Sequence, residues 1–429
     1  MSQVKPWARV ALAMFAVGWG ANQFSPMLIV YRHALGLGPG EIAGLFAIYA
    51  ATLIPGLLAG GPLSDRFGRR ACVLPFAALS PVATLLLVLG PHDLASIAAG
   101  RALAGLCSGM VFGPATAWVQ DLSDRGAVSA RRAALALSAG FGLGPVVAAL
   151  LAQWAPDPLV VPYLPHLALG AAAFAVGWTA PDRLGEPAGP GESPRRGEPA
   201  VTGRRWVPAA VRTRAFWLAV APAAPFVFGS VSLAIVVLPE EVTSARTLSA
   251  GYAGLMTAAA FAAGIGVQPA ARQLAARRPR AGLVAGLAAA AAGAAVGAAA
   301  VAGANRVLAG LAAVLLGLAY GLCLVCGLRQ AEQLAGPRDR GAVLAWYYVL
   351  AYLGFAAPYA VDGLNGLFGK PGTFAALAVA AALVTGLLSV RVSRRAAGGV
   401  DGSPDAGDIP RPLSVRVTGA GAKPSVRSE

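Results

Sequence analysis

The chain has 429 residues, of which 57% are hydrophobic and 12% are charged, and its formal net charge at pH 7 is +15. A typical soluble domain carries about 25% charged residues, so this composition excludes an ordinary water-soluble protein and indicates one that spans a membrane. A high positive charge also occurs in nucleic-acid-binding proteins. The distribution of the basic residues along the chain distinguishes a nucleic-acid-binding protein from a membrane protein.

Long apolar segments recur along the chain, separated by short polar or proline- and glycine-rich joints. Each is close to the roughly 20 residues that an α-helix needs to cross a bilayer. The first is long enough to span and is followed by further spans, so we expect it to remain as a membrane helix and not to act as a cleaved signal. The predicted spans are residues 10–30, 42–61, 72–90, 94–118, 133–154, 163–180, 215–238, 250–270, 281–301, 305–328, 342–362 and 372–390.

A polar segment divides these twelve spans into six and six. It is rich in Pro, Gly and Arg and too polar to bury, as is typical of a linker. The sequence therefore predicts an all-α integral membrane protein built from two pseudo-symmetric six-helix bundles. The predicted domains are an N-terminal bundle (1–180), a cytoplasmic linker (181–214), a C-terminal bundle (215–390) and a disordered cytoplasmic tail (391–429).

The two halves also resemble each other in sequence. LAGLCSG at 103–109 is echoed by LAYGLCLVCG at 318–327, and SDRGAVSA at 123–130 by RDRGAVLA at 338–345. These stretches lie in the fourth span of each half and on the approach to the fifth. Parallel repeats of this kind place the substrate site near the middle of the membrane, between the halves.

The basic residues are distributed unevenly between the two sides of this topology. Cytoplasmic segments of membrane proteins are enriched in Lys and Arg, and with the N-terminus inside, the inner segments hold all but five of the 34 basic residues. We therefore expect the chain to lie in the cell membrane with both termini in the cytoplasm, and its charge does not indicate nucleic-acid binding. The five exceptions are Arg32, Arg101, Arg246, Arg306 and Lys370.

The four cysteines lie in or beside apolar segments, where a free thiol behaves as a small hydrophobic group. Cys323 and Cys326 form a C-x-x-C pair, but no histidine or second pair completes a set of metal ligands. The sequence predicts no metal and no cofactor.

The joint between the second and third spans concentrates charge in a chain that carries little of it. It reads GPLSDRFGRR from Gly61 to Arg70. Expulsion of charge from the bilayer explains the arginines as a topology anchor, but not the aspartate beside two glycines that permit a tight turn. The joint matches the G-x-x-x-D-R-x-G-R-R loop of the major facilitator superfamily, which the chain resembles from the first span to the twelfth. The matching residues are Gly61, Asp65, Arg66, Gly68, Arg69 and Arg70.

Two further motifs support this resemblance. The fourth span contains the family's R-x-x-x-G-x-x-x-G motif, and the fifth contains its G-x-x-x-G-P motif. Glycines four residues apart lie on one face of a helix and let a neighbouring backbone come close. The alternative to a family motif is ordinary packing of small residues between helices. The family associates the fifth-span motif with antiporters, chiefly exporters that exchange drugs or metabolites against protons. This chain departs from it in having Ala148 and Ala149 where paired glycines often follow. The motif residues are Arg101, Gly105 and Gly109, then Gly140, Gly144 and Pro145.

The resemblance implies that the charged joint is a cytoplasmic gate. Asp65 would lie against the start of the eleventh span near Gly341, where the positive end of the helix dipole favours an anion. Arg66 and Arg69 would reach acidic residues at the end of the fourth span, with Asp121 or Asp124 as candidates. These contacts would close the cytoplasmic side when the protein faces outward and break when it faces inward.

Polar and aromatic side chains near the middle of three spans are the candidate substrate contacts. Hydrogen-bonding groups are costly there unless they meet a substrate, water or a neighbouring helix, so interhelical bonding is the alternative in the first span. An aromatic face suits a hydrophobic or amphipathic ligand, although aromatic belts also form at lipid interfaces. The candidates are Trp19, Asn22 and Gln23 in the first span, Phe226 and Phe228 in the seventh, and Tyr348 and Tyr352 in the eleventh.

Proton coupling requires a membrane-embedded group that changes its charge. No Asp or Glu lies in the middle of a predicted span, and Arg101 stays permanently protonated. His166, near the outer end of the sixth span, titrates in a useful range, and Asp362 lies near the outer end of the eleventh. Both are candidate coupling residues, with a surface position as the alternative for each.

The resemblance implies a secondary active transporter that works by alternating access, and proton-coupled efflux of small hydrophobic or amphipathic molecules fits the antiporter motif. Two alternatives are uptake or facilitated transport of a polar metabolite, and a non-transporting membrane sensor. No enzyme is predicted, because the spans contain no nucleophile with its base and no paired carboxylates. The expected partners are a small-molecule substrate, membrane lipid and protons, and the expected assembly is a monomer.

Overall fold

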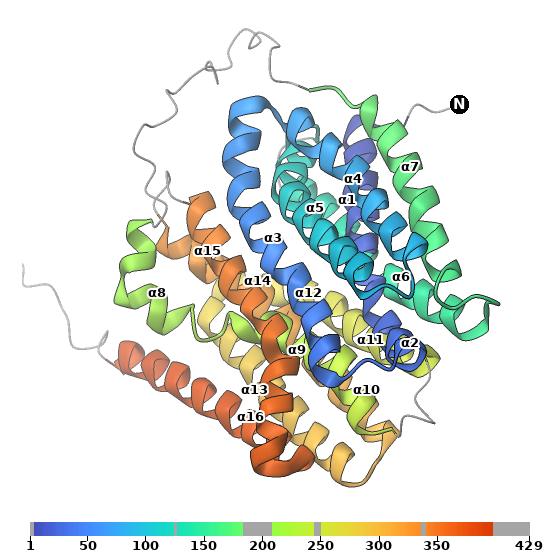
Figure 1. Cartoon of the computed structure of the whole chain (residues 1–429). Helices are drawn as coiled ribbons and strands as arrows, with labels where there is room; N and C mark the ends of the chain where they lie inside the picture. The colour runs from blue at the N-terminus through green and yellow to red at the C-terminus, as the bar shows by residue number, and fades with distance from the viewer. Residues whose placement is uncertain (1–3, 124–126, 183–207, 244–249, 336–339, 398–429) are drawn as a thin grey trace, which may run out of the picture.

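The computed structural model describes residues 4–123, 127–182, 208–243, 250–335 and 340–397, and every regular element in these ranges is a helix (Figure 1). We call α1–α7 the first half and α8–α16 the second half. The first half contains α1 (Pro6–Asn22), α2 (Phe24–Leu35), α3 (Pro39–Phe67), α4 (Arg69–Leu89), α5 (Leu94–Asp121), α6 (Ala127–Trp154), η1 (Val161–Tyr163) and α7 (Leu164–Trp178). The second half contains η2 (Ala209–Arg212), α8 (Arg214–Ala219), α9 (Pro225–Ser232), η3 (Leu233–Val237), α10 (Leu238–Glu241), α11 (Ala250–Gly266), α12 (Gln268–Arg277), α13 (Pro279–Ala302), α14 (Arg306–Leu334), α15 (Arg340–Tyr352), η4 (Leu353–Ala356) and α16 (Ala357–Ala397).

Nine helical stretches among the described residues are long and apolar enough to cross a membrane. The first and seventh predicted spans do not qualify, because breaks divide them into shorter helices. In the first, Pro26 has no N–H to donate to Asn22, and the helix is interrupted between them at Gln23. The eleventh and twelfth predicted spans run as one stretch, bent at Gly369, whose φ of 67° favours glycine. The all-α membrane fold predicted from the sequence is confirmed.

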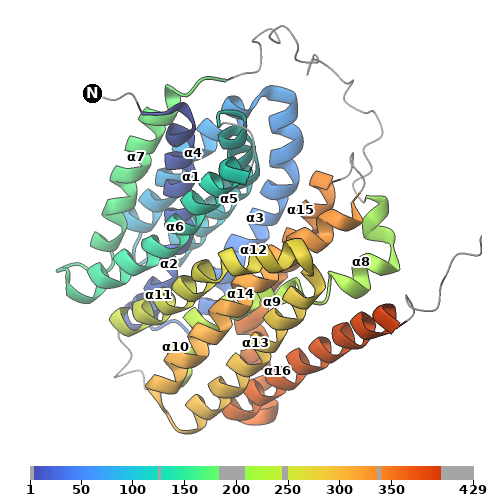
Figure 2. The ribbon, with the colours of Figure 1, turned by 180° about the vertical axis from the view of Figure 1, so that it is seen from behind.

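Within each half, helices that are neighbours in space include many that are not consecutive in sequence (Figure 1 and Figure 2). In the first half, α3 and α4 lie against α5, and α1 lies against α6. In the second half, α13 lies against α14 and α16, and α11 lies against α14. Contacts of α6 with α11 and of α3 with α15 connect the halves.

The repeated sequence makes the same kind of helix crossing in each half. A β-carbon added at Gly105 of α5 would lie 2.2 Å from the carbonyl oxygen of Tyr49 in α3. One added at Gly321 of α14, the matching glycine of the repeat, would lie 2.2 Å from the carbonyl oxygen of Gly264 in α11. Only a residue without a side chain permits helices to approach this closely. The fourth span of each half therefore crosses the second span of its half at a glycine.

The helix ends gather on two faces of the molecule. The inner face holds the junction of α3 and α4 at Gly68 and the end of α5, where Arg69 lies beside Asp121. The outer face holds the ends of α2 and α10, joined by Arg32 and Glu240. These names follow the predicted orientation, in which the inner face is cytoplasmic.

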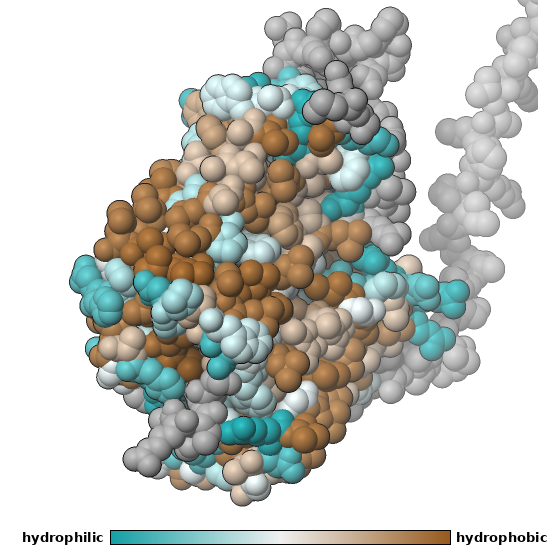
Figure 3. All heavy atoms as spheres, turned by 90° about the vertical axis from the view of Figure 1, so that its right-hand side faces the viewer, coloured by the Kyte–Doolittle hydropathy of each residue, from teal (hydrophilic) through white to brown (hydrophobic). Residues whose placement is uncertain are grey.

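The surface between these two faces is apolar. Figure 3 shows hydrophobic side chains over much of one flank, and large apolar side chains are exposed on several helices, among them Leu143, Leu255 and Leu383. Soluble monomers rarely expose contiguous apolar patches larger than a few hundred Å². Lipid tails are the environment that such a helical surface suits.

Candidate functional site

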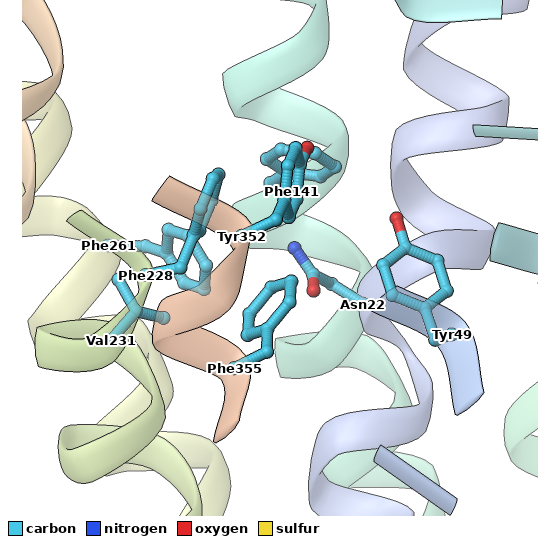
Figure 4. Close-up of a pocket in the computed structure, with 8 residues that line it drawn as sticks. All are labelled: Asn22, Tyr49, Phe141, Phe228, Val231, Phe261, Tyr352 and Phe355. Atoms are coloured by element: carbon cyan, nitrogen blue, oxygen red, sulfur yellow. The ribbon is translucent and has the colours of Figure 1, made fainter. Parts of the chain in front are cut away.

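A small cavity lies between the two halves (Figure 4), with a volume of about 10 Å³. Both halves contribute to its wall, and six of the eight lining side chains are aromatic. The lining residues are Asn22, Tyr49 and Phe141 of the first half, and Phe228, Val231, Phe261, Tyr352 and Phe355 of the second.

The aromatic rings of the cavity pack closely against one another. Phe228 and Tyr352 are stacked, with ring centroids 4.3 Å apart. Phe355 lies 4.9 Å from Phe228 and, across the boundary between the halves, 4.9 Å edge-to-face from Phe46. A cavity of this volume holds about one water molecule, whereas a drug-sized ligand occupies a pocket of roughly 300 Å³ or more. A ligand of that size therefore enters only when the halves move apart.

Asn22, Phe228 and Tyr352, three of the seven predicted substrate contacts, line this cavity. Tyr348 lies one turn before Tyr352, and their ring centroids are 6.4 Å apart. The structure therefore brings predicted residues from the first, seventh and eleventh spans to one place.

The other predicted substrate contacts lie away from the cavity wall. Gln23 donates a hydrogen bond from Nε2 to Oγ1 of Thr84, at 3.0 Å. Trp19 lies in the contact between α1 and α6. Phe226 packs against a cluster of alanines around Ala290. For Gln23 the structure thus shows the interhelical bond that was the alternative to substrate contact.

Sequence reasoning missed five of the lining residues: Val231 on the seventh span and four aromatic residues. The four aromatic residues lie on the second, fifth, eighth and eleventh spans, which form two equivalent pairs in the repeats. Both spans of each pair carry an aromatic residue, and this recurrence is the signal that could have identified them. The four residues are Tyr49, Phe141, Phe261 and Phe355.

The glycines of the fifth-span motif lie where α6 crosses α1 at close range, beside the cavity. A β-carbon added at Gly140 would lie 2.3 Å from the carbonyl oxygen of Phe15, and one at Gly144 would lie 2.7 Å from that of Trp19. Pro145 follows directly, within the same helix. The two glycines therefore let α6 approach α1, and each of these helices supplies one residue to the cavity.

Gly105→Leu is expected to destabilise the protein strongly. The added β-carbon would lie 2.2 Å from both the carbonyl oxygen of Tyr49 and Oγ1 of Thr52. Overpacking of a tight contact costs about 3 kcal/mol, so we expect a lower melting temperature and less monodisperse protein in detergent. Gly113→Leu on the same helix is the control, because nothing lies within 4 Å of its β-carbon. Equal melting temperatures for the two variants would contradict the crossing.

Arg101 is a buried charge behind the cavity wall. It is 2% exposed and donates hydrogen bonds to the carbonyl oxygens of Leu45 and Ala21, both at 3.3 Å. Its guanidinium carbon lies 4.4 Å from the ring centroid of Phe24 and 4.6 Å from that of Tyr49. Among the described residues no carboxylate pairs with it. Because Tyr49 lines the cavity, this positive charge lies one side chain away from it.

His166 is fully buried inside the first half. Its Nδ1 lies 2.7 Å from Oγ1 of Thr84, which also accepts the hydrogen bond from Gln23, and its Nε2 lies 3.5 Å from Oγ of Ser80. A β-carbon added at Gly20 would lie 2.5 Å from Nε2, so the imidazole occupies the space that this glycine leaves. The predicted coupling residue thus links α7 to α4 and to the junction of α1 and α2.

The charged joint lies at the inner face, where α3 ends at Phe67 and α4 begins at Arg69. Gly68 between them has a φ of 102°, a conformation that favours glycine. Nε of Arg69 lies 3.6 Å from Oδ2 of Asp121 at the end of α5, and Nη1 donates a hydrogen bond to Oγ of Ser64 at 2.6 Å. The joint is therefore tied to the end of the fourth span.

The other residues of the joint motif, Gly61, Arg66 and Arg70, do not share the contacts of Arg69. No atom lies within 4 Å of a β-carbon added at Gly61. Arg66 is exposed, and its guanidinium carbon lies 5.0 Å from the ring centroid of Phe67, whereas that of Arg70 lies 5.1 Å from the ring centroid of Trp178. The Arg70 N–H donates to Oδ2 of Asp182 at 3.3 Å. Arg70 thus holds the joint against the end of α7.

Part of the predicted gate lies outside the described residues. This holds for the side chain of Asp65, for the surroundings of Gly341 and for Asp124. The contact between Asp65 and the start of the eleventh span stays a prediction.

A network of charged and polar groups joins the halves at the outer face, around a pocket of about 250 Å³. Nη1 of Arg32 in the first half lies 2.7 Å from Oε2 of Glu240 in the second. Beside them, Oε2 of Glu241 lies 2.9 Å from Nζ of Lys370, and Oε1 accepts a hydrogen bond from Nδ2 of Asn365 at 3.1 Å. Arg32 and Glu240 therefore form an ion pair between the two halves.

Glu240 lies just beyond the outer end of the seventh predicted span. Burial raises the pKa of Glu240, and the nearby charge of Arg32 opposes this effect without cancelling it. Asp362, a predicted coupling residue, lines the same pocket with an exposed side chain. Sequence reasoning missed Glu240 because it lies at a span end. The available signal was that Arg32 and Lys370 are two of the five basic residues outside the inner segments.

The helices α6 and α11 also meet tightly near the outer face. The Gly251 N–H donates to Oε1 of Gln153 at 3.1 Å. One turn further along α11, a β-carbon added at Gly254 would lie 2.3 Å from the β-carbon of Ala149. Gly254 thus leaves the space that the methyl group of Ala149 needs.

Comparisons with known proteins agree with this architecture. A family model described as Major Facilitator Superfamily matches residues 10–358. The chain is 26% identical over 142 residues to the quinolone resistance protein NorA of Staphylococcus aureus, a match that spans 33% of this chain and 36% of that relative.

Two solved structures share the fold over nearly the whole chain. A POT family transporter in complex with 5-aminolevulinic acid has a TM-score of 0.71 and 13% identity, covering 90% of this chain and 96% of its own. The POT family transporter PepTSo has a TM-score of 0.71 and 14% identity, covering 92% and 99%. At these identities the similarity is one of fold alone.

Proposed function

Because the chain belongs to the Major Facilitator Superfamily, we propose that it is a secondary transporter that exports small hydrophobic or amphipathic molecules in exchange for protons. The cavity between the halves carries this proposal, since aromatic side chains from both halves line it. Transporters built from parallel repeats bind substrate near the midplane, at the interface of the repeats. A wall of six rings and one amide suits an apolar, ring-containing molecule better than a polar metabolite.

Alternating access fits the position of the contacts between the halves. At the outer face, α2 is joined to α10 by an ion pair and α6 to α11 by a hydrogen bond, which supports closure of the cavity from that side. Transport requires these contacts to break while others form at the inner face. We assign the inner contacts to the charged joint, through Asp65 and the start of the eleventh span, because the pair of Arg69 with Asp121 lies within the first half and is already formed.

Glu240 is the proposed proton carrier. Because burial raises its pKa, it takes up a proton at a less acidic pH than an exposed glutamate does. Protonation removes the charge that holds Arg32, so an acidic exterior loosens the outer contact and favours release of cargo outward. His166 and Asp362 suit this role less well, because His166 is enclosed within the first half and Asp362 is exposed.

The direction and setting of transport are also part of the proposal. A partial relative is named a quinolone resistance protein, and the fifth-span motif resembles that of antiporters, both of which support export. We place the protein in the cell membrane with both termini in the cytoplasm. It acts as a monomer, because one chain supplies both halves of the cavity.

Flux through proteoliposomes tests the proposal. The full chain is reconstituted, and movement of a fluorescent aromatic probe is followed with and without a pH gradient. We expect protein-dependent flux that the gradient accelerates. Flux that ignores the gradient would contradict proton exchange, and probe binding without any flux would identify the sensor alternative instead.

Phe228→Ala is expected to raise the KM for the aromatic probe about tenfold, equivalent to about 1.4 kcal/mol. The variant removes the ring that stacks on Tyr352 in the cavity. Phe174→Ala is the matched control, because it removes a ring that contacts Trp178 in α7, away from the cavity. The same rise in KM for both variants would refute the assignment of the cavity as the substrate site.

A further inference from the structure

We propose that the cavity selects its substrate by charge: it accepts flat aromatic molecules that carry a carboxylate and rejects those that carry an ammonium group. The inference rests on the proposed function, because it names the substrate class for the same cavity. Three features of the cavity support this charge preference: the residues of its wall, the charge of Arg101 and the amide of Asn22.

The described cavity wall has no carboxylate that could balance a cation. Its described lining consists of six aromatic rings, one valine and one asparagine, with no acidic side chain among them. An ammonium ion that leaves water for such a site loses its hydration and needs a counter-charge. Ring faces attract cations, but they carry no net charge, and Arg101 already lies over one face of Tyr49.

The charge behind the wall is positive and is not neutralised by a carboxylate of the described residues. Arg101 keeps its charge at all physiological pH values, and its guanidinium carbon lies 4.6 Å from the ring centroid of Tyr49. Charges in a protein interior interact more strongly than charges in water. The field of Arg101 therefore repels an ammonium group in the cavity and attracts a carboxylate.

Asn22 offers hydrogen bonds to the ligand that Arg101 attracts. Figure 4 shows its amide end pointing in among the rings, beside Phe355. The preceding residue, Ala21, accepts a hydrogen bond from Arg101, so the amide and the guanidinium approach the cavity from the same segment. An amide NH₂ group donates two hydrogen bonds, which suits a carboxylate held between the rings.

Binding of three probes of similar shape tests the charge preference. The probes are 2-naphthoate, 2-naphthalenemethanol and 2-naphthylmethylammonium, and their dissociation constants are measured by equilibrium dialysis with the full chain in detergent. We expect 2-naphthoate to bind about tenfold or more tightly than the ammonium compound, with the neutral alcohol between them. Equal affinity for the two ions, tighter binding of the ammonium compound, or no binding of any probe would overturn the proposal.

Three variants test whether Arg101 and the uncharged wall cause the preference for the carboxylate over the ammonium compound. Arg101→Gln is expected to bring the two ions to similar affinity. Because that change also removes packing, Asn22→Asp is an independent test: it adds a carboxylate to the wall and is expected to reverse the preference. Arg132→Gln is the control, since Arg132 lies 4.3 Å from the ring centroid of Trp7, outside the cavity. A wild-type preference that persists in Asn22→Asp would overturn the proposal.

Flux separates this inference from the function on which it rests. If the three probes bind in the expected order but none crosses a proteoliposome membrane, the transport proposal fails and the charge preference stands. If aromatic probes cross with a pH gradient and the ammonium compound crosses as fast as the carboxylate, the charge preference fails and transport stands.

Discussion

Glu240→Gln is expected to abolish transport driven by a pH gradient while leaving exchange of substrate for substrate intact. Glutamine keeps the shape of a protonated glutamate but cannot bind or release a proton, and it loses the 2.7 Å ion pair with Arg32. Gradient-driven transport requires a group that takes up a proton on one side and releases it on the other. Exchange needs only that the halves move, so it does not require this group.

The pH dependence of transport follows from the raised pKa of Glu240. Above that pKa the carboxylate is charged, and its ion pair with Arg32 closes the outer face; below it the carboxyl group is neutral and the pair is lost. Because burial raises the pKa, this change occurs nearer neutral pH than for an exposed glutamate. Wild-type flux should therefore fall as the external pH rises through the pKa, whereas the flux of Glu240→Gln should not respond.

Reconstituted protein gives the measurement. Flux of an aromatic probe is compared with and without a pH gradient, and exchange of labelled for unlabelled probe is followed at equal pH. Glu332→Gln is the control, because Glu332 also pairs with an arginine, Arg329 at 3.1 Å, but within one helix of the second half. Gradient-driven flux as fast in Glu240→Gln as in the wild type would refute the role of Glu240.

The helical fold could be predicted because each span carries its own signal, a run of about 20 apolar residues. The breaks within the first and seventh spans were harder to predict from the sequence. Pro26 was visible in the sequence, but the interruption at Gln23 depends on how the neighbouring helices hold the chain.

The site was predictable only in part. Asn22 stands out as a polar residue in an apolar span, and aromatic residues such as Phe228 stand out in theirs. Tyr49 does not, because a span that is apolar on all sides does not show which of its faces meets the cavity. The ion pair of Arg32 with Glu240 joins residues 208 positions apart, and neither partner indicates the other.

A disulfide across the outer face is expected to stop transport completely and reversibly. Gln153→Cys and Gly251→Cys together place two thiols at the contact of α6 with α11. A β-carbon at position 251 would lie 3.5 Å from Cγ of Gln153, so the two introduced side chains would be in contact, as formation of a disulfide requires. The four native cysteines are buried, so an added oxidant acts on the introduced pair, and each single-cysteine variant is a control for the oxidant itself.

The central claim is that the two halves must separate at the outer face in every transport cycle. Flux of an aromatic probe through proteoliposomes holding the Gln153→Cys and Gly251→Cys protein tests it directly. After oxidation the flux should fall to that of empty liposomes, and addition of a reductant should restore it. Undiminished flux through protein shown to be fully cross-linked would contradict alternating access at this face.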